Sequence, residues 1–438
     1  MTIKFEPSRR GFLGLAAGLG AIAATGTGTK KASAQPVATK AKIVILGAGA
    51  AGTALANRLV DRLDGAEIIL VDGRKEHWYQ PGFSLIAAGL KKASYAVSQT
   101  ADWLRNGITL KRDMAANIDP DAKKVALQSG EVLDYDYLVV ATGLSLNYDA
   151  IDGFDMGMIG QNGLGSLYAG PDYAAKTWTA AGRYADEGGV GIFTRPATEM
   201  KCAGAPIKHT FLIDDIARKN GTKNLDINYM AHSQSLFGVP IIAEKLRMLY
   251  KQRQITAHYE HVLKSVDAGA KKATFATPGG DVEMGYDYLH IVPPQQAPEV
   301  VRTSPLTNPG SWDGRGWVTV DKFTLRHTFF DTVFAVGDVA GVPKGKTAAS
   351  AKWQVPVVEE HIVAQIAGDT TDAAYNGYTS CPLITRVGRA MLIEFDYNND
   401  LVPSFPGVIA PLEELWISWL MKEVALKATY NAMIRGDA

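Results

Sequence analysis

The sequence predicts an α/β fold with two Rossmann-like domains of parallel strands and helices, followed by a helical C-terminal tail. Apolar runs that end in glycine recur at 43–52, 135–143 and 332–338, and a helical pattern opens directly after the first of them. Buried parallel strands that alternate with helices produce this pattern. The 438 residues are 47% hydrophobic and 21% charged, a balance that indicates a globular protein of about two to three domains and excludes disorder, collagen and a coiled coil.

Charge and cysteine content exclude several classes of function. The chain has 45 basic and 45 acidic residues, so it offers no basic surface for nucleic acid. Residues 1–34 hold five basic residues and one acidic residue, which leaves 40 basic and 44 acidic residues in the remainder. Because that remainder is mildly acidic, membrane contact would depend on apolar burial rather than on attraction to anionic lipid. Two cysteines are too few for a disulfide framework and lack the spacing of a zinc site, so they would act as a pair.

The first 34 residues predict an export signal. Residues 8–13 (Ser-Arg-Arg-Gly-Phe-Leu) form a twin-arginine pattern, and Ala-Ser-Ala at 32–34 suggests cleavage before Gln35. The apolar run at 11–24 is too short to span a bilayer core, which needs about 20 residues. Because twin-arginine export carries folded proteins, we expect a cofactor-loaded protein in the periplasm, attached peripherally to the inner membrane. The alternative is a disordered N-terminus with a chance arginine pair.

The first glycine motif predicts a dinucleotide site. The apolar run at 43–46 leads directly into Gly-Ala-Gly-Ala-Ala-Gly at 47–52. Gly47 would permit the tight turn, Gly49 would let the backbone approach a pyrophosphate, and Gly52 would allow close packing of helix and strand. Asp72 ends the next strand, twenty residues after Gly52, and can bind a ribose diol. The motif alone does not distinguish FAD from NAD, and the alternative is a glycine-rich turn without a ligand.

Two further motifs favour FAD. Residues 135–143 (Tyr-Asp-Tyr-Leu-Val-Val-Ala-Thr-Gly) form a strand and a small-residue turn, where the backbone would pass close to a cofactor. Residues 332–338 form another strand that ends in Gly-Asp. Asp338 can bind ribityl hydroxyls, and a helix starting after it would direct its dipole at the flavin ring. That dipole, or a cation such as Lys346, would stabilise the negative charge of reduced flavin.

The middle of the chain lacks the second glycine motif that NAD(P)H-dependent flavoproteins carry. Gly-Gly-Val-Gly-Ile-Phe at 188–193 begins like such a strand, but 194–206 contain no matching glycines. A proline and Cys202 occupy the region where a nicotinamide pyrophosphate would need open backbone. We therefore expect an electron donor that reacts at Cys202 in place of NADH.

The two cysteines have distinctive surroundings. Cys202 precedes the helical stretch 207–217 and follows Lys201, two features that lower the pKa of a thiol. Cys381 lies 179 residues further on and is followed by Pro382, which suits a rigid bend. The alternative is a pair of buried, inert cysteines.

Several segments resemble one enzyme family. They are Lys-Cys-Ala-Gly-Ala-Pro-Ile-Lys at 201–208, Val-Pro-Pro at 292–294, Thr-Ser-Pro at 303–305, Lys-Thr-Ala-Ala at 346–349, Gly-Tyr-Thr-Ser-Cys-Pro-Leu-Ile-Thr at 377–385, Glu-Phe-Asp-Tyr at 394–397 and His-Trp-Tyr-Gln-Pro at 77–81. They are similar to sulfide:quinone oxidoreductases, most of all to the type II branch that includes the mitochondrial enzyme. The resemblance covers 41–438 and implies the glutathione-reductase type of fold, within the FAD-dependent pyridine nucleotide-disulfide oxidoreductases. The chain lacks the third cysteine of other branches, and its export signal departs from the cytoplasmic or matrix-facing placement common in the family.

The resemblance also implies a mechanism. Cys202 and Cys381 would form a redox-active disulfide or sulfur-bridged pair beside the flavin. Sulfide would attack Cys381 and form a persulfide, and the Cys202 thiolate would donate to flavin C4a. The electrons would pass to membrane quinone, and the sulfur to a small acceptor or into polysulfide. Glu199 would shuttle protons, or it is a solvated carboxylate.

The same resemblance implies the FAD contacts and the domain limits. The FAD contacts are Gly47, Gly49, Ala51, Gly52, Asp72, Gln80, Ala115, Thr142, Gly143, Gly337, Asp338, Lys346 and Thr347. The domains are the signal at 1–34, the FAD-binding domain in two parts at 41–150 and 301–350, a second Rossmann-like domain without an NAD motif at 151–300, and a C-terminal region at 351–438 with a quinone pocket. A homo-oligomer is compatible with this organisation.

The tail predicts an interfacial amphipathic helix. Its apolar residues have helical spacing, with charged residues between them. They are Leu412, Leu415, Trp416, Trp419, Leu420, Met421, Val424 and Leu426. The alternative is a C-terminal helix packed on the core. Phe395 and Tyr397 are candidates for stacking on a quinone ring or are core residues, and His258 and His261 lack a third ligand, so no metal site is expected.

Three rival functions remain open. One is the exported flavoprotein subunit of a flavocytochrome c sulfide dehydrogenase, although such subunits usually attach FAD covalently through an N-terminal cysteine and this chain has none before Cys202. Another is a type II NADH dehydrogenase, which the missing nicotinamide motif opposes. The last is a flavin-binding interaction protein without turnover, which the paired cysteines oppose.

Overall fold

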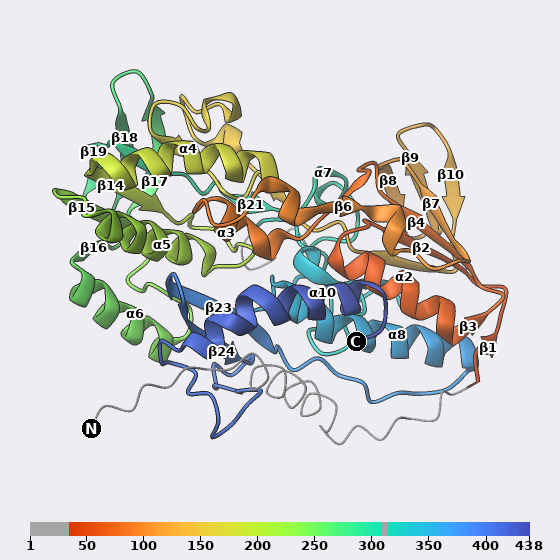
Figure 1. The fold of residues 1–438 in the computed structure, drawn as a ribbon. Helices are drawn as coiled ribbons and strands as arrows, with labels where there is room; N and C mark the ends of the chain where they lie inside the picture. Colours follow the sequence, from red (N-terminus) through yellow and green to blue (C-terminus); the bar gives the residue numbers. More distant parts are fainter. Residues whose placement is uncertain (1–34, 309–313) are drawn as a thin grey trace.

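Two parallel sheets form the frame of the computed structural model, which describes residues 35–308 and 314–438 (Figure 1). The first sheet has the strand order β22-β11-β2-β4-β7. Its strands are β2 (Lys42–Leu46), β4 (Glu67–Val71), β7 (Ile108–Lys111), β11 (Tyr137–Val140) and β22 (Val333–Ala335). All neighbours pair in parallel, so their carboxyl ends meet at one edge, where α/β sheets bind ligands.

Helices α2 (Ala50–Arg62) and α8 (Ala348–Ala367) pack together beside this sheet. Arg58 and Arg62 of α2 both pair with the buried carboxylate of Glu359 on α8, although 301 residues separate Arg58 from Glu359. A buried carboxylate is tolerated only when it is paired in this way. The late segment 333–367 is therefore fixed against the first glycine motif by both a strand and a helix.

The second parallel sheet has the order β13-β20-β14-β15-β16. Its strands are β13 (Leu164–Gly165), β14 (Gly189–Thr194), β15 (Leu225–Met230), β16 (Ile255–His258) and β20 (Tyr288–His290). The helices of this part are α4 (Pro171–Glu187), α5 (Ala205–Asn220) and α6 (Pro240–Arg253). Helix α5 begins at the carboxyl end of β14, which places residue 202 at the edge of the sheet.

Smaller elements complete the two halves. Antiparallel sheets are formed by β8 (Ala115–Asp119), β9 (Lys124–Leu127) and β10 (Val132–Asp134), and by β17 (Val262–Asp267), β18 (Lys272–Thr277) and β19 (Gly280–Gly285). Short strands are β1 (Val37–Ala38), β3 (Leu63–Asp64), β5 (Glu76–Trp78), β6 (Val97–Gln99), β12 (Ser145–Leu146) and β21 (Gln295–Gln296). Short helices are α3 (Phe83–Ile86) and α7 (Glu299–Arg302).

A hairpin and a helical tail end the chain. Strands β23 (Thr379–Arg386) and β24 (Arg389–Phe395) pair antiparallel, with Cys381 opposite Ile393. The tail consists of α9 (Trp416–Leu420), one π-helical turn (Met421–Ala425) and α10 (Leu426–Ile434). Helix α9 packs on β24, and α10 packs on α2 (Figure 1). The tail therefore lies against the body of the molecule along its whole length.

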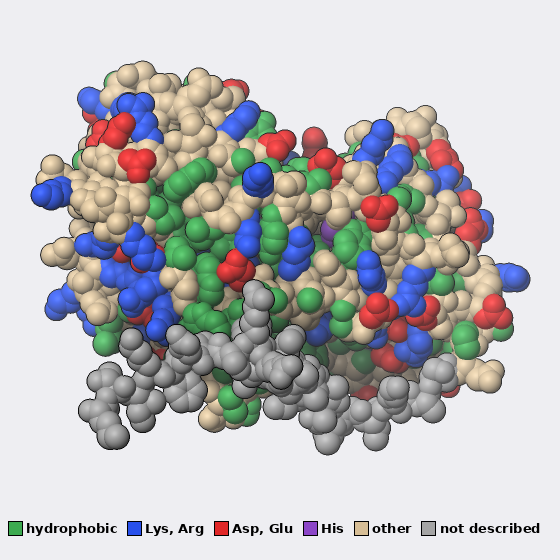
Figure 2. Space-filling view, in the orientation of Figure 1, with side chains coloured by type: hydrophobic (Ala, Val, Ile, Leu, Met, Phe, Trp, Pro, Cys, Tyr) green, Lys and Arg blue, Asp and Glu red, His purple; other side chains and the backbone are tan. Residues whose placement is uncertain are grey.

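The surface matches the near-neutral composition. Basic and acidic side chains are interspersed over the visible face, and apolar side chains gather across its middle (Figure 2). None of the helices in 35–308 and 314–438 is long and apolar enough to cross a membrane. The predicted twin-arginine signal at 1–34 lies outside the described residues.

Candidate functional site

Three glycines bring β2, α2 and β11 close together at the carboxyl edge of the first sheet. Gly47 has a φ of +103°, and a Cβ there would lie 2.4 Å from the carbonyl oxygen of Ala141. A Cβ on Gly52 would lie 1.9 Å from the carbonyl oxygen of Gly47. By contrast, a Cβ on Gly49, the N-cap of α2, would meet no atom within 4 Å. Close backbone packing beside an open helix N-terminus is the geometry that a pyrophosphate requires.

Polar groups follow two strands of the same edge. Asp72, directly after β4, accepts hydrogen bonds of 2.8 Å from the backbone N–H groups of Ala48 and Arg74, and each of its oxygens keeps a lone pair for a ribose. The hydroxyl of Thr142, after β11, is buried and has no hydrogen-bond partner among the described residues. Gly143 beside it has a φ of +70° and open space where a Cβ would stand. An unpartnered buried hydroxyl beside open space indicates a missing ligand.

The turn after β22 reaches the same region. A Cβ on Gly337 would lie 3.3 Å from the Cβ of Ala51, and the Gly337 N–H donates 2.7 Å to the Gln354 side chain. Burial raises the pKa of Asp338. The open N-terminus of α2, the Thr142 hydroxyl and the carboxylates after β4 and β22 together fit FAD.

The helix that follows Asp338 is α8, which begins ten residues later, so the direction of its dipole toward a flavin stays a prediction. A short 3-10 turn (Gly337–Val339) follows the strand, and α8 begins only at Ala348. Two glycines and Pro343 lie in the intervening stretch, which makes helix formation there unfavourable. Thr347 instead caps α8 by accepting a 3.1 Å hydrogen bond from the Ser350 N–H.

Lys346 connects the flavin side of the site to the cysteine side. Its ammonium donates to the carbonyl oxygens of Asp338 at 2.7 Å and Ala340 at 3.3 Å. It also lies 3.3 Å from a carboxylate oxygen of Glu199 and 3.7 Å from the centre of the Trp317 ring. Glu199 is thus an ion-pair partner in the site rather than a solvated carboxylate. A role of Lys346 toward reduced flavin stays a prediction.

The remaining predicted FAD contacts lie on separate elements. Gln80 opens the 3-10 turn Gln80–Gly82 and is exposed. Ala115 is half-buried at the start of β8. The structure gives neither side chain a feature that by itself indicates a ligand.

Cys202 and Cys381 meet, although 179 residues separate them. Both line a cavity of about 200 Å³ between the second sheet and the β23–β24 hairpin. A Cβ on Gly204 would lie 2.6 Å from the sulfur of Cys381, so the hairpin sulfur packs directly on the loop that carries Cys202. Other side chains that line this cavity are Arg195, Glu199, Phe237, Lys344, Lys346 and Phe395.

The two thiols differ in acidity. A hydrogen bond from the Cys381 thiol, and then the ammonium of Lys208, hold the pKa of Cys202 well below its ordinary value despite burial. The same hydrogen bond, together with burial, raises the pKa of Cys381. The Nζ of Lys208 lies 3.4 Å from the sulfur of Cys202. Cys202 is therefore the more acidic of the two thiols and the better leaving group in thiol–disulfide exchange.

Two buried lysines complete the cysteine site, and the sequence did not predict either. Lys208 is 4% exposed and Lys422 is 2% exposed. Burial, reinforced by the charge of Lys208, lowers the pKa of Lys422 to about 7, and the charge of Lys422 acts on both sulfurs. Lys208 stands on α5 four residues after Gly204, so helical spacing from the cysteine loop could have indicated it. Lys422 comes from the C-terminal tail, whose position no local pattern predicts.

The backbone of Cys202 has an uncommon conformation. Its φ is +46°, which is rare for a residue other than glycine and costs free energy. Three hydrogen bonds hold it there. The N–H of Cys202 donates 2.8 Å to the Lys346 carbonyl oxygen, and the Cys202 carbonyl accepts from the Tyr168 hydroxyl at 3.1 Å and the Ala205 N–H at 2.8 Å. The direction of the sulfur is thus fixed by neighbours from three segments.

The second sheet carries this cysteine loop where a nicotinamide turn would stand. The connection from β14 to α5 spans 195–204, and α5 opens with Gly204 as its N-cap and Pro206 in its first turn. A Cβ on Gly191 would lie 2.5 Å from the Tyr184 ring, so packing inside this domain accounts for that glycine. The positive end of the α5 dipole lies close to Cys202, which favours a thiolate.

The two candidate quinone aromatics lie apart. Phe395 lines the cysteine cavity. Tyr397 instead donates its hydroxyl to the Lys322 carbonyl oxygen at 2.9 Å and packs edge-on against Phe323 and Tyr375. They therefore do not form one stacking pocket.

The two tryptophans of the tail also have different surroundings. Trp419 is buried in a cluster with Leu212 of α5 and Ile384 of β23. Trp416 is 49% exposed, and Val424 is 62% exposed. One face of the tail therefore packs on the core, as the alternative prediction stated, and the other face has an exposed apolar stripe.

The histidines form no metal site among the residues the structure describes. His258 bonds the Asn228 side chain at 2.7 Å, and His261 bonds the Tyr259 carbonyl oxygen at 2.7 Å. Each of the two rings thus has a hydrogen-bond partner within the second domain.

Another two histidines are buried side by side in the second domain. The His209 and His290 rings are 4.5 Å apart, and the His209 ring bonds the Tyr288 hydroxyl at 2.6 Å. Within 35–308 and 314–438, neither ring nitrogen of His290 has a hydrogen-bond partner. Burial lowers the pKa of His209 to about 3 and that of His290 well below its ordinary value. Both are therefore neutral at physiological pH.

Comparison with known proteins extends this picture. The family model for pyridine nucleotide-disulphide oxidoreductases matches residues 41–169. The chain is 33% identical to the mitochondrial sulfide:quinone oxidoreductase of Dictyostelium discoideum, over 95% of this chain and 91% of that protein. It is also 33% identical to the mitochondrial sulfide:quinone oxidoreductase of Mus musculus, over 90% of this chain and 86% of that protein.

A solved structure shares the fold. The sulfide:quinone oxidoreductase of Aquifex aeolicus superposes with a TM-score of 0.76 at 22% identity, over 91% of this chain and 92% of that one. The predicted α/β fold is therefore confirmed, and so is the resemblance noted in the sequence.

Proposed function

This chain belongs to the sulfide:quinone oxidoreductase family, and from that premise we propose that it oxidises sulfide at Cys202 and Cys381 and passes the electrons to a quinone. FAD is the cofactor of this flavoprotein family. The observation that carries the proposal is the meeting of the two cysteines in one cavity, with the ammonium of Lys208 3.4 Å from the sulfur of Cys202.

The sulfide step uses the disulfide form of the pair. A hydrosulfide ion attacks the sulfur of Cys381, the bond between the two cysteines breaks, and Cys381 becomes a persulfide. Cys202 leaves as a thiolate with the bonding electron pair. A thiol of lower pKa leaves faster in such exchanges, and the pKa of Cys202 is the lower of the two. This supports Cys381 as the residue that accepts sulfide.

Sulfur transfer and reoxidation complete the cycle. A small thiolate, or a second hydrosulfide ion, attacks the outer sulfur and leaves Cys381 as a thiolate. The two thiolates then lose two electrons and the disulfide forms again. FAD, when bound, supplies the two-electron acceptor for that step and delivers the electrons to quinone. Lys208, and Lys422 in its protonated form, stabilise the anionic sulfurs by charge.

We infer that the residues at the edge of the first sheet hold FAD. The turn from Gly47 to Gly52, including Gly49 and Ala51, would receive the pyrophosphate, and Asp72 the ribose. Other contacts would come from Gln80, Ala115, Thr142, Gly143, Gly337, Asp338, Lys346 and Thr347. The pairing of β22 with β11 supports one FAD-binding domain built from 41–150 and 301–350.

Membrane contact is proposed for the outer stripe of the tail. Trp416, Leu420 and Val424 repeat at four-residue spacing, and the first and last are about half exposed or more. An exposed apolar stripe with a tryptophan suits the bilayer interface. Such attachment would bring the enzyme to membrane quinone.

Export to the periplasm is a separate proposal, which rests on the twin-arginine pattern at 8–13. Replacing Arg9 and Arg10 by lysine should keep a reporter fusion in the cytoplasm of a bacterial host, whereas the native signal should deliver it to the periplasm. A reporter that stays cytoplasmic with the native signal would contradict export.

An anaerobic flavin titration tests the function. Sulfide should bleach the flavin absorbance of the FAD-loaded protein, NADH should not, and a quinone analogue should restore the absorbance. Bleaching by NADH would instead indicate an NADH dehydrogenase. Reoxidation by cytochrome c and not by quinone would indicate a sulfide dehydrogenase subunit, and no bleaching by either donor would indicate a protein without turnover.

A further inference from the structure

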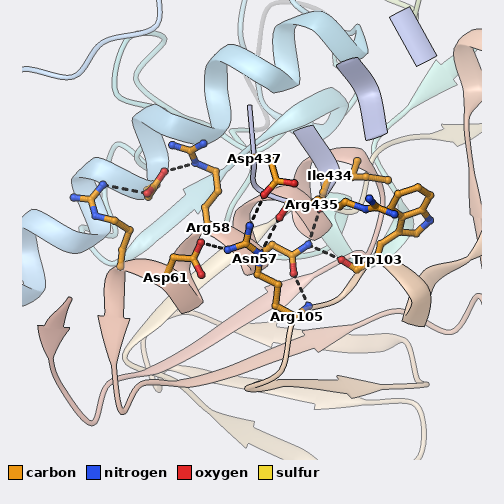
Figure 3. A network of polar contacts seen from close by, with 10 residues as sticks. Asn57, Arg58, Asp61, Trp103, Arg105, Ile434, Arg435 and Asp437 are labelled. Atoms are coloured by element: carbon orange, nitrogen blue, oxygen red, sulfur yellow. Dashed lines mark hydrogen bonds and ion pairs between the residues drawn. The ribbon is translucent and has the colours of Figure 1, made fainter. Parts of the chain in front are cut away.

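The end of the C-terminal tail is clamped to helix α2 by one buried asparagine (Figure 3). Asn57 is fully buried, and its amide nitrogen donates to the carbonyl oxygens of Trp103 at 2.8 Å and Ile434 at 2.6 Å. Its amide oxygen accepts 2.8 Å from the N–H of Arg105. One side chain therefore joins α2, the 103–105 loop and the last turn of α10.

Arg105 forms the other half of this clamp (Figure 3). Its guanidinium donates to the Arg435 carbonyl oxygen at 3.0 Å and to the Asp437 carboxylate at 2.6 Å, and it also pairs with Asp61. The guanidinium of Arg435 lies 4.8 Å from the centre of the Trp103 ring. The last residues of the chain are thus bonded at both backbone and side chain.

Further contacts fix the tail along its length. The Tyr430 hydroxyl bonds the His77 ring at 2.7 Å, and Lys427 donates 2.6 Å to the Tyr95 carbonyl oxygen. Lys422 donates 2.7 Å to the Pro81 carbonyl oxygen. All these partners lie in the segment 77–105 of the FAD-binding part. The tail is a strap laid along that segment, with Asn57 at its far end.

The near end of the strap reaches α5, which follows the Cys202 loop, and β23, which carries Cys381. Trp419 packs in a buried cluster with Leu212 of α5 and Ile384 of β23. Lys422 follows it in the π-helical turn Met421–Ala425. A π-turn is a local departure from helical geometry that is frequent at functional sites. Twelve residues of helix separate Lys422 from Ile434, about 18 Å at 1.5 Å per residue, so Asn57 acts on Lys422 only through the helix.

We propose that Asn57 is a positioning residue for the sulfide reaction: by holding the carbonyl of Ile434, it keeps the tail helix in place so that the charge of the buried Lys422 continues to act on the Cys202–Cys381 pair. The proposal rests on the proposed function of that pair. Replacing Asn57 by alanine leaves two buried carbonyl groups and one N–H without their partner, which favours release of the end of the strap.

The test is the pH dependence of Cys202 alkylation in the reduced, FAD-loaded enzyme, followed by mass spectrometry. Several charged or titratable groups interact with the Cys202 sulfur and therefore influence this pH profile. They are Lys201, Lys208, Lys422, Cys381, Tyr168 and Asp338. Asn57→Ala should shift the profile to higher pH and slow alkylation at pH 6 by about fivefold or more. Arg62→Ala, which loosens α2 from α8 without touching the tail, should keep the native profile.

A double-mutant cycle separates positioning from general destabilisation. In a Lys422→Met background, Asn57→Ala should change the alkylation rate by less than about twofold, because the group it positions is gone. An equal effect of Asn57→Ala in both backgrounds, or an unchanged pH profile in the folded variant, would overturn the proposal. If Asn57→Ala does not fold, deletion of 434–438, which removes the Ile434 carbonyl that Asn57 holds and keeps Asn57 itself, should give the same shift. Alkylation does not depend on turnover, so a failure of sulfide to bleach the flavin would count against the proposed function alone.

Discussion

Replacing Lys208 by methionine removes the ammonium 3.4 Å from the Cys202 sulfur and keeps most of the side chain's volume. An opposite charge at such a distance shifts a pKa by about 1–3 units. Because the ammonium favours the thiolate, its loss should raise the pKa of Cys202. The midpoint of the alkylation profile should therefore move to higher pH by about 1–3 units, and the rate at pH values below the native midpoint should fall by about 10- to 1000-fold.

The assay is alkylation by iodoacetamide across pH 4 to 9, with the modified peptide counted by mass spectrometry. Lys208→Arg keeps a positive charge and should retain most of the native rate. Lys219→Met is the matched control, because this lysine stands on the same helix, is 55% exposed and pairs with Asp215. A native alkylation profile in Lys208→Met would refute the account of the thiolate, whereas a shifted profile in Lys219→Met would show that the helix, and not the local charge, is responsible.

Three further changes have distinct expected outcomes. Gly204→Ala places a methyl group 2.6 Å from the sulfur of Cys381, so sulfide should bleach the flavin at about one tenth of the native rate or more slowly still. Bleaching at the native rate would contradict this packing. Trp416→Glu should abolish co-flotation with lipid vesicles, whereas Phe329→Glu, at an exposed site elsewhere, should not; equal flotation of both would contradict the tail stripe. His209 and His290 have depressed pKa values in the folded protein, so the unfolded chain binds more protons below about pH 6.5. The contribution of these two histidines to stability is therefore full above about pH 6.5 and is lost as the pH falls toward about 3. His290→Phe should therefore flatten the fall in unfolding free energy below pH 6.5 by about 1.4 kcal/mol per pH unit, measured by urea denaturation, and an unchanged slope would rule out this histidine.

Local patterns predicted the first sheet and its glycine turns well. Within 43–52, the apolar residues predict the strand and the glycines predict the turn and the helix N-terminus, and Asp72 follows twenty residues after Gly52. The helix expected after Asp338 begins only at Ala348, because the proline and glycines of the stretch between them disfavour a helix. The domain limits and the roles of the predicted FAD contacts stay predictions.

The cysteine site shows where sequence reasoning ends. The settings of Cys202 and Cys381 indicated reactivity, but their meeting depends on how the hairpin packs against α5, which is a long-range contact. Lys422 is the clearest example. From the sequence, a lysine in an apolar tail is expected to be solvated, and only the position of the tail, fixed by the bond from Asn57 to Ile434, shows that Lys422 is buried. The two tail tryptophans likewise share helical spacing in the sequence and separate only when one face is buried.

The central claim is tested most directly by anaerobic stopped-flow bleaching of the flavin with sulfide in three FAD-loaded proteins: the native chain, Cys202→Ser and Cys381→Ser. The account predicts rapid bleaching of the native protein and no sulfide-dependent bleaching in either variant above the slow reaction of free FAD. Bleaching of either serine variant at the native rate would contradict it.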